Sequence, residues 1–166
     1  KNNGQISFAG PDPRMGSLNA SDICCSNGRD VWVGGSSGLW HIEASTGEFT
    51  PILMDGNSIE WVSSICEDAE GYLWVCSCEH GLYRYDTKTF SFRKYSEDRL
   101  YWSNVAYKDL KGRLWVGTWG KGLLRIDAPH GPGNLSCTVY SNTPEAGSLL
   151  DDVIYDIGQD TEGRLM

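Results

Sequence analysis

The sequence has no long hydrophobic run and no excess of positive charge. No stretch approaches the roughly 18 consecutive apolar residues that a membrane-spanning helix requires, so no segment is expected to contact the membrane. Its 14 Lys and Arg residues stand against 22 Asp and Glu residues, a net charge of −8. Because a phosphate backbone demands a basic face, this balance argues against nucleic acid as a partner.

Common catalytic and metal-site motifs are also absent. There is no G-x-S-x-G elbow, no H-E-x-x-H pair and no phosphate-binding loop. Six cysteines are present, but Cys76 and Cys78 form a C-x-C pair without a second pair or matching histidines, so they do not fit a zinc site. A glycosidase would need two carboxylates held across one bond, which a sequence cannot show. We expect no catalytic residue, no metal and no cofactor here. A disulfide between two of the cysteines remains an alternative if the chain lies in an oxidising compartment.

What the chain has in abundance is glycine and tryptophan, in three copies of one pattern. A Trp-Val pair recurs at Trp32, Trp74 and Trp115, 42 and 41 residues apart. A Gly-Leu pair follows each one: Gly38-Leu39, Gly81-Leu82 and Gly122-Leu123. A period of about forty residues with strand-like content is typical of β-propeller blades, so the expected fold class is all-β.

Each copy divides into four short strands. In the second copy these are expected at residues 62–67, 72–76, 81–86 and 90–95. Asp68 to Gly71 forms the first turn, since Asp bonds its own turn backbone and Gly tolerates a positive φ. Strands also fit the two ends of the chain, at residues 5–8 and 153–157.

The copies predict a fragment of one propeller domain, with three complete blades and two partial blades. We expect the end of a preceding blade, three blades and the start of a further blade at residues 1–17, 18–54, 55–97, 98–146 and 147–166. Propellers close with four to eight blades, so two blade faces would be left open. The chain is therefore expected to be part of a longer protein, packed against its other blades, or to complete its ring with copies of itself, as in a homodimer.

The repeat resembles the two-component regulator propeller repeat. The third copy carries the pattern D-x-x-G-x-L-W-V-G-T, then G-L-x-R-x-D, at Asp109, Gly112, Leu114, Trp115, Val116, Gly117, Thr118, Gly122, Leu123, Arg125 and Asp127. The second copy departs at Cys76-Ser77, and the first lacks the turn Asp and has Glu43 in place of the last Asp. The resemblance implies a periplasmic sensor region of a bacterial hybrid histidine kinase, ahead of the membrane, that senses glycans. Kinase activity is expected only in parts of such a protein outside these residues.

Candidate binding residues gather on one predicted face. In an antiparallel blade, the loops before the first strand and after the second lie on the same side of the sheet. These loops carry aromatic, charged and imidazole side chains: Glu60, Trp61, Tyr101, Trp102, His80, Trp119 and Lys121. Aromatic plates beside polar groups suit a sugar ring, although packing between blades would explain Trp61 and Trp102 equally well. For Trp32, Trp74 and Trp115 we expect core packing.

Three function classes stay open. The first is a sensor module that recognises an oligosaccharide for a two-component signalling protein. The second is a carbohydrate-active propeller enzyme, a lyase or a hydrolase. The third is a structural propeller that serves protein–protein interaction.

Overall fold

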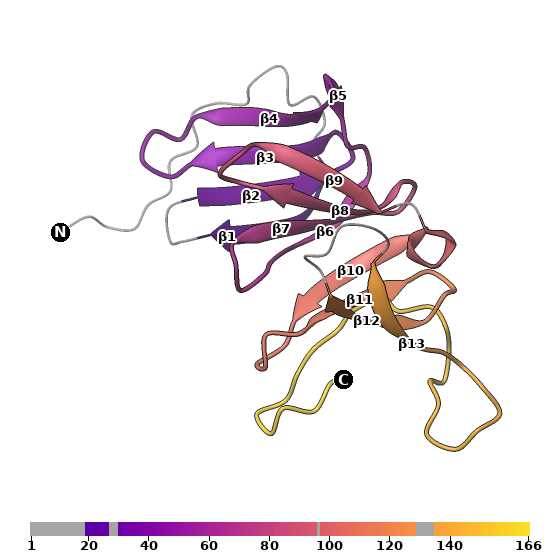
Figure 1. Cartoon of the computed structure of the whole chain (residues 1–166). Helices are drawn as coiled ribbons and strands as arrows, with labels where there is room; N and C mark the ends of the chain where they lie inside the picture. The colour runs from indigo at the N-terminus through magenta and orange to yellow at the C-terminus, as the bar shows by residue number, and fades with distance from the viewer. Residues whose placement is uncertain (1–18, 27–29, 96, 129–134) are drawn as a thin grey trace.

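The computed structural model describes residues 19–26, 30–95, 97–128 and 135–166, and their strands form three antiparallel sheets in succession (Figure 1). The first sheet contains β1 (Ala20–Ser26), β2 (Asp30–Gly35), β3 (Gly38–Glu43), β4 (Phe49–Met54) and β5 (Asn57–Ser58). The second contains β6 (Val62–Glu67), β7 (Tyr72–Ser77), β8 (Gly81–Asp86) and β9 (Ser91–Tyr95). The third contains β10 (Ser103–Lys108), β11 (Leu114–Thr118), β12 (Leu123–Ala128) and β13 (Ser136–Tyr140).

Each sheet is an up-and-down blade, because its spatial order is its chain order. A single 3-10 turn, η2 (Asp98–Leu100), leads from the second blade to the third in the described part of the chain. No helix there is long and apolar enough to span a membrane. The all-β, propeller-like prediction is confirmed, and in the second blade the strand at Gly81–Asp86 has the expected bounds.

The strand predicted at residues 153–157 does not form. This segment makes one isolated bridge, between Val153 and Trp119, and otherwise contains no β-structure. Among the described residues no strand lies beside it to complete a ladder, and the backbone N–H of Ile157 bonds instead to the adjacent Asp156 side chain at 2.8 Å. A strand needs a partner for its backbone groups, so the prediction from its own pattern was wrong here. The strand predicted at residues 5–8 lies outside the described residues.

The hydrophobic core lies between blades. One cluster joins the first and second blades around Trp32, Val62 and Tyr85, and another joins the second and third blades around Trp74 and Leu124. Trp32 and Trp74 therefore pack between neighbouring sheets, as the sequence predicts. Trp115 belongs to neither cluster and packs against Tyr140 of its own blade. Each of the three repeated tryptophans is at most 5% exposed: Trp32, Trp74 and Trp115.

The turn aspartates hold these tryptophans in place. Asp68 accepts the backbone N–H groups of Glu70 and Tyr72, and its other oxygen accepts the indole N–H of Trp74 at 2.9 Å. Asp109 repeats the arrangement with Trp115, again at 2.9 Å. The sequence predicts the turn, but the bond to the buried indole appears only in the structure.

The first blade lacks this bond. Ser26 stands where the other copies have Asp, and its hydroxyl donates to Glu67 at 2.6 Å. The indole N–H of Trp32 is buried and has no hydrogen-bond partner among the described residues. A buried donor without an acceptor costs free energy, so the first blade gives up stability that the other two keep.

Candidate functional site

The two predicted loop families lie together on one face. The carbonyl of Trp61 accepts the backbone N–H of Cys78 at 3.2 Å, and the carbonyl of Trp102 accepts that of Trp119 at 3.0 Å. In both blades, therefore, the residue just before the first strand bonds to the loop after the second strand. This hydrogen bond fixes the backbone of each tryptophan relative to its own blade.

Trp61 and Trp102 occupy equivalent positions and share an unusual conformation. Their φ angles are +54° and +64°, in a left-handed region that bulky residues rarely adopt. Their side chains are 52% and 44% exposed, and neither belongs to an interblade core cluster. Strained, exposed aromatic residues in matching places of two blades are the kind of outlier that motivates a functional hypothesis.

The other predicted residues surround these tryptophans. The Tyr101 ring meets the Trp102 ring edge-on, with centroids 5.6 Å apart. Lys121 Nζ lies 3.0 Å from an Asp98 carboxylate oxygen, so its charge is compensated. Ser77 links the predicted residues Glu60 and His80. Its hydroxyl donates to the Glu60 carbonyl at 2.8 Å and accepts the backbone N–H of His80 at 3.2 Å.

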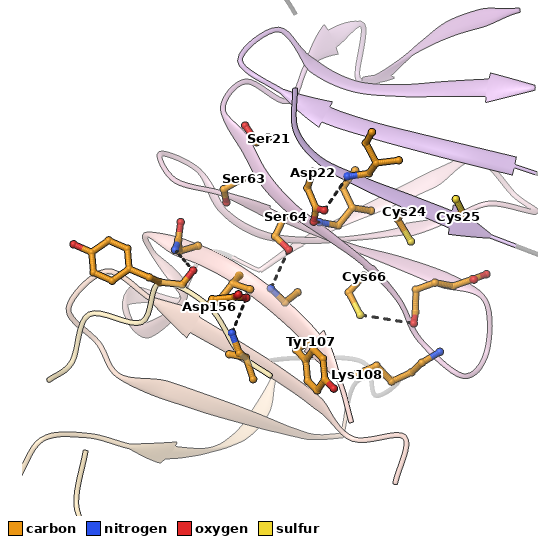
Figure 2. A pocket seen from close by; sticks show the side chains of 18 residues that line it. Ser21, Asp22, Cys24, Cys25, Ser63, Ser64, Cys66, Tyr107, Lys108 and Asp156 are labelled. Atoms are coloured by element: carbon orange, nitrogen blue, oxygen red, sulfur yellow. Dashed lines mark hydrogen bonds between the residues drawn. The ribbon is translucent and has the colours of Figure 1, made fainter. Parts of the chain in front are cut away.

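An axial groove of about 670 Å³ opens beside this face (Figure 2). Its walls are the first strands of all three blades, β1, β6 and β10, together with residues 155–157. These strands contact one another across blades, so they lie where the blades converge. The volume is within the range of small-molecule sites.

Polar side chains cap the inner edges of these strands. The backbone N–H of Ile65 donates to Asp22 of the preceding blade at 2.7 Å, and that of Ala106 donates to Ser64 at 3.3 Å (Figure 2). The register of each first strand also shifts near its start, between residues 20 and 22, 62 and 64, and 103 and 105. Such bulges re-aim side chains near functional rims. Side chains thus satisfy one backbone N–H on the inner edge of β6 and one on that of β10, and they line the groove.

Sequence reasoning missed the residues that join the groove to the loop face. Tyr155 lines the groove, is 72% exposed and meets the Trp119 ring at 5.5 Å between centroids. Asn104 also lines the groove and donates its amide to the carbonyls of Ile154 and Tyr155 at 3.0 and 3.3 Å. Asn104 and Tyr155 share one strand position, five residues before Asp109 and Asp160, but Ser63 occupies the same position before Asp68, so the position alone did not identify them. We define the aromatic loop face as Trp61, Tyr101, Trp102, Trp119 and Tyr155.

Two of the thiols along the groove, Cys24 and Cys66, are poor nucleophiles. Burial raises the pKa of Cys66 to about 12 and also raises that of Cys24. Such groups stay protonated at neutral pH, and only the thiolate attacks or binds metal strongly. All six cysteines are free thiols, and no metal-binding group of His, Cys, Asp and Glu occurs in the described residues.

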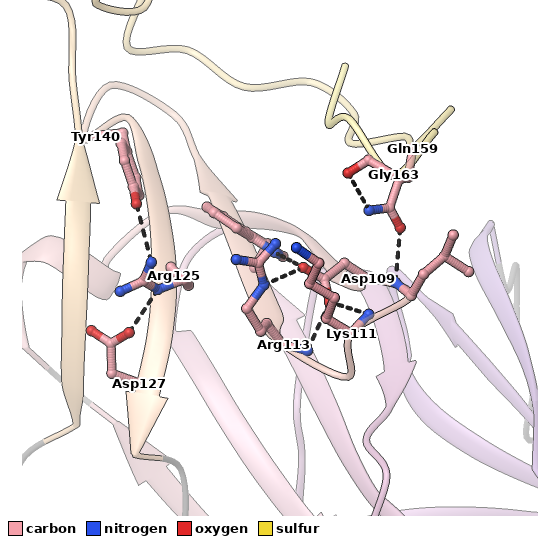
Figure 3. Close-up of polar contacts among 10 residues, drawn as sticks. Asp109, Lys111, Arg113, Arg125, Asp127, Tyr140, Gln159 and Gly163 are labelled. Carbon is pink, nitrogen blue, oxygen red and sulfur yellow. Dashed lines mark hydrogen bonds and ion pairs between the residues drawn. The ribbon is translucent and has the colours of Figure 1, made fainter. Parts of the chain in front are cut away.

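Asp109, Arg125 and Asp127 of the family pattern tie strands and turns together away from this face (Figure 3). Thr118 and Gly122 of the same pattern bracket the loop that carries Trp119, and the Thr118 hydroxyl donates to the Gly122 carbonyl at 2.8 Å. Arg125 Nε lies 2.7 Å from Asp127 on the same strand, and one of its terminal nitrogens lies 3.4 Å from the Tyr140 hydroxyl on the next. Bonds from Thr138 and Arg125 hold the pKa of Asp127 below its usual value. Asp109, Arg125 and Asp127 therefore have a structural role, and they do not form the binding surface.

Phe90 provides a prediction about strain on the opposite side of the blade. It has a φ of +55° and is 75% exposed, while Gly47 has a φ of +72° at the equivalent turn of the first blade. We expect Phe90→Gly to raise the free energy of unfolding by about 0.5–1 kcal/mol, because glycine adopts this region without a Cβ clash. Urea denaturation measures this change in the free energy of unfolding. Phe90→Ala is the control, because alanine keeps a Cβ and therefore the backbone strain at a φ of +55°. A loss of stability on Phe90→Gly would contradict the assignment.

Comparisons with known proteins agree with this architecture. A sequence model for the two-component regulator propeller matches residues 55–79, which confirms the resemblance seen in the sequence. No curated protein matches the chain.

Solved structures share the blades. The extracellular domain of the one component system BT4673 from B. thetaiotaomicron has a TM-score of 0.73 and 22% identity over 93% of this chain and 21% of its own. That of the hybrid two component system BT3049 from the same organism has a TM-score of 0.71 and 22% identity, over 89% and 20%. Virginiamycin B lyase from Staphylococcus aureus has a TM-score of 0.59 and 16% identity, over 88% and 47%. The likeness shows a β-propeller fold, and the chain spans about a fifth of the two extracellular domains.

Proposed function

We propose that this chain is part of a periplasmic sensor region of a two-component signalling protein, and that its aromatic loop face binds an oligosaccharide. The observation that carries the proposal is the matched pair Trp61 and Trp102, exposed and held in a strained conformation at the same place in two blades. The flat apolar faces of such rings suit the C–H face of a sugar, while nearby amide and hydroxyl groups suit its hydroxyls. The family repeat and the extracellular domains with similar blades support the signalling context.

The surface also suits a signalling role because it crosses blade boundaries. Trp61 precedes the second blade, Trp102 precedes the third, and Tyr155 belongs to the segment after it. A ligand that contacts all of them binds best when the blades keep one relative arrangement. Only such differential binding can shift a conformational equilibrium, which histidine kinase parts elsewhere in a longer protein would then read.

A binding experiment with aromatic variants tests the proposal. In calorimetric titration against a panel of oligosaccharides, we expect one glycan to bind and Trp102→Ala to weaken it about tenfold or more, since a central aromatic anchor is worth at least ~1.4 kcal/mol. Phe90→Ala is the matched control, because this exposed aromatic residue has the same backbone conformation on the opposite side. Equal affinities for both variants would contradict the site.

The same panel separates the other function classes. Cleavage of the bound glycan would favour the enzyme alternative. No binding, together with a concentration-dependent self-association, would favour a structural propeller.

A further inference from the structure

The charge around the aromatic loop face has a single dominant sign. Carboxylates on the loops of this face outnumber the strongly basic groups, with Asp55, Glu60, Glu79, Glu97, Asp98, Glu145, Asp151 and Asp152 against Arg99 and Lys121. Both bases are already compensated, Lys121 by Asp98 and Arg99 by Glu97. Among the described residues of these loops, no Lys or Arg without a carboxylate partner is left to receive an anionic ligand.

Two of the carboxylates belong to residues next to Trp61 and form no ion pair within the described part of the chain. Glu60 precedes Trp61 directly, and Glu79 follows Cys78, whose N–H bonds to the Trp61 carbonyl. Both side chains are exposed, and neither lies within ion-pair distance of a Lys or Arg in the described part of the chain. Two uncompensated negative charges therefore lie on the loops next to Trp61, where a ligand would stack.

We propose that the aromatic loop face selects uncharged oligosaccharides and rejects those that carry uronate or sulfate groups. This inference rests on the proposed function and narrows its ligand class. An anionic sugar would bring like charges together in a site where no base can pair with them, and such contacts cost binding free energy. A neutral sugar has no such cost, and its hydroxyls can donate to the same carboxylates.

Quenching of tryptophan fluorescence tests the potential without any ligand. Iodide, caesium and neutral acrylamide each reach exposed indoles, and only the ions respond to local charge. In Glu60→Gln/Glu79→Gln at low salt, we expect the quenching constant for iodide to rise roughly twofold relative to the unmodified chain, that for caesium to fall, and that for acrylamide to stay constant. The effect should shrink near 0.15 M salt, where the Debye length is about 8 Å.

The matched control is Glu48→Gln/Glu162→Gln, which removes the same charge from exposed turn residues on the opposite face. An equal rise in iodide quenching in both double variants would overturn the proposal, since only net charge would then matter. The binding panel adds a second arm, in which sulfated and desulfated forms of one glycan are compared. Tighter binding of the sulfated form also overturns the selectivity, whereas failure of every glycan to bind removes the proposed function and leaves the potential measured by quenching intact.

Discussion

Asp109→Ala is expected to lower the free energy of unfolding by about 3 kcal/mol or more. The carboxylate is 3% exposed and accepts the N–H groups of Lys111 and Arg113 and the indole of Trp115, each at 2.9 Å, and pairs with Arg113 Nε at 2.6 Å (Figure 3). Removing it leaves a buried indole donor and two turn N–H groups without an acceptor. Chemical denaturation of the purified chain measures the change.

The control for this experiment is Asp160→Ala. Asp160 makes the same turn bonds to Glu162 and Arg164, but no tryptophan of the described chain donates to it, and it is more exposed. We expect a much smaller loss there. Comparable losses at Asp109 and Asp160 would mean that the turn, and not the indole, accounts for the stability.

The same carboxylate predicts how stability depends on pH. Burial alone would raise the pKa of Asp109, but hydrogen bonds from Trp115 and Arg113 outweigh it and hold the pKa below its usual value. A lowered folded-state pKa adds stability above the unfolded value, near 4, and this contribution is lost as the pH falls through the folded-state pKa. Asp109→Asn should therefore flatten the acid limb of the stability curve below about pH 4.

Gly117→Ala is expected to destabilise the chain by about 2 kcal/mol, because the blades leave no room for one methyl group. A Cβ at this position would lie 2.5 Å from Ile154 Cγ2 and 2.7 Å from Val105 Cγ1. A glycine in one blade faces a branched side chain of the next blade at two boundaries, since Gly34 faces Val62 as Gly117 faces Ile154. At the boundary between the second and third blades the sizes are reversed, because the larger Cys76 takes the glycine position and the smaller Ser103 takes the position of the branched residue. Thermal and urea unfolding both measure the change.

Gly158→Ala is the matched control, since the nearest atom to its Cβ would be Met166 Cε at 4.0 Å and its φ is not positive. We expect almost no change there. Adding Ile154→Ala to Gly117→Ala should recover part of the loss by opening space for the methyl. If Gly117→Ala is as neutral as Gly158→Ala, the segment at residues 153–157 does not pack against the third blade.

The blades were predictable because their physics is local and repeated. Strand patterns and a tryptophan every forty-odd residues recur three times, with an Asp-x-x-Gly turn in the second and third copies, and each copy forms an antiparallel sheet. The wrong prediction of a strand at residues 153–157 has a related cause. A single segment can show the residue pattern of a strand, but a strand forms only where a second strand accepts and donates its backbone hydrogen bonds. The bond from Asp68 to Trp74 also escaped prediction, because it joins a turn to a buried ring across a fold that the sequence only implies.

The candidate site was predictable only in part. Loop order in an antiparallel sheet correctly gathers Trp61, Trp102 and Trp119 on one face, where hydrogen bonds join the loops. Tyr155 lies beyond the third blade and joins this face through its ring contact with Trp119. Its repeat position is occupied by Ser63 in the second blade, so the repeat pattern does not predict an aromatic residue there. Backbone strain at Trp61 and Trp102 likewise has no signal in the sequence, yet it is the strongest argument that their exposure serves binding.

The most direct test of the account is to follow the indole N–H resonances of all seven tryptophans during titration with a neutral oligosaccharide. The account predicts that the exposed Trp61, Trp102 and Trp119 shift or broaden together, while the buried Trp32, Trp40, Trp74 and Trp115 hold their positions. Saturable shifts confined to the buried group, with the three exposed indoles unmoved, would contradict it.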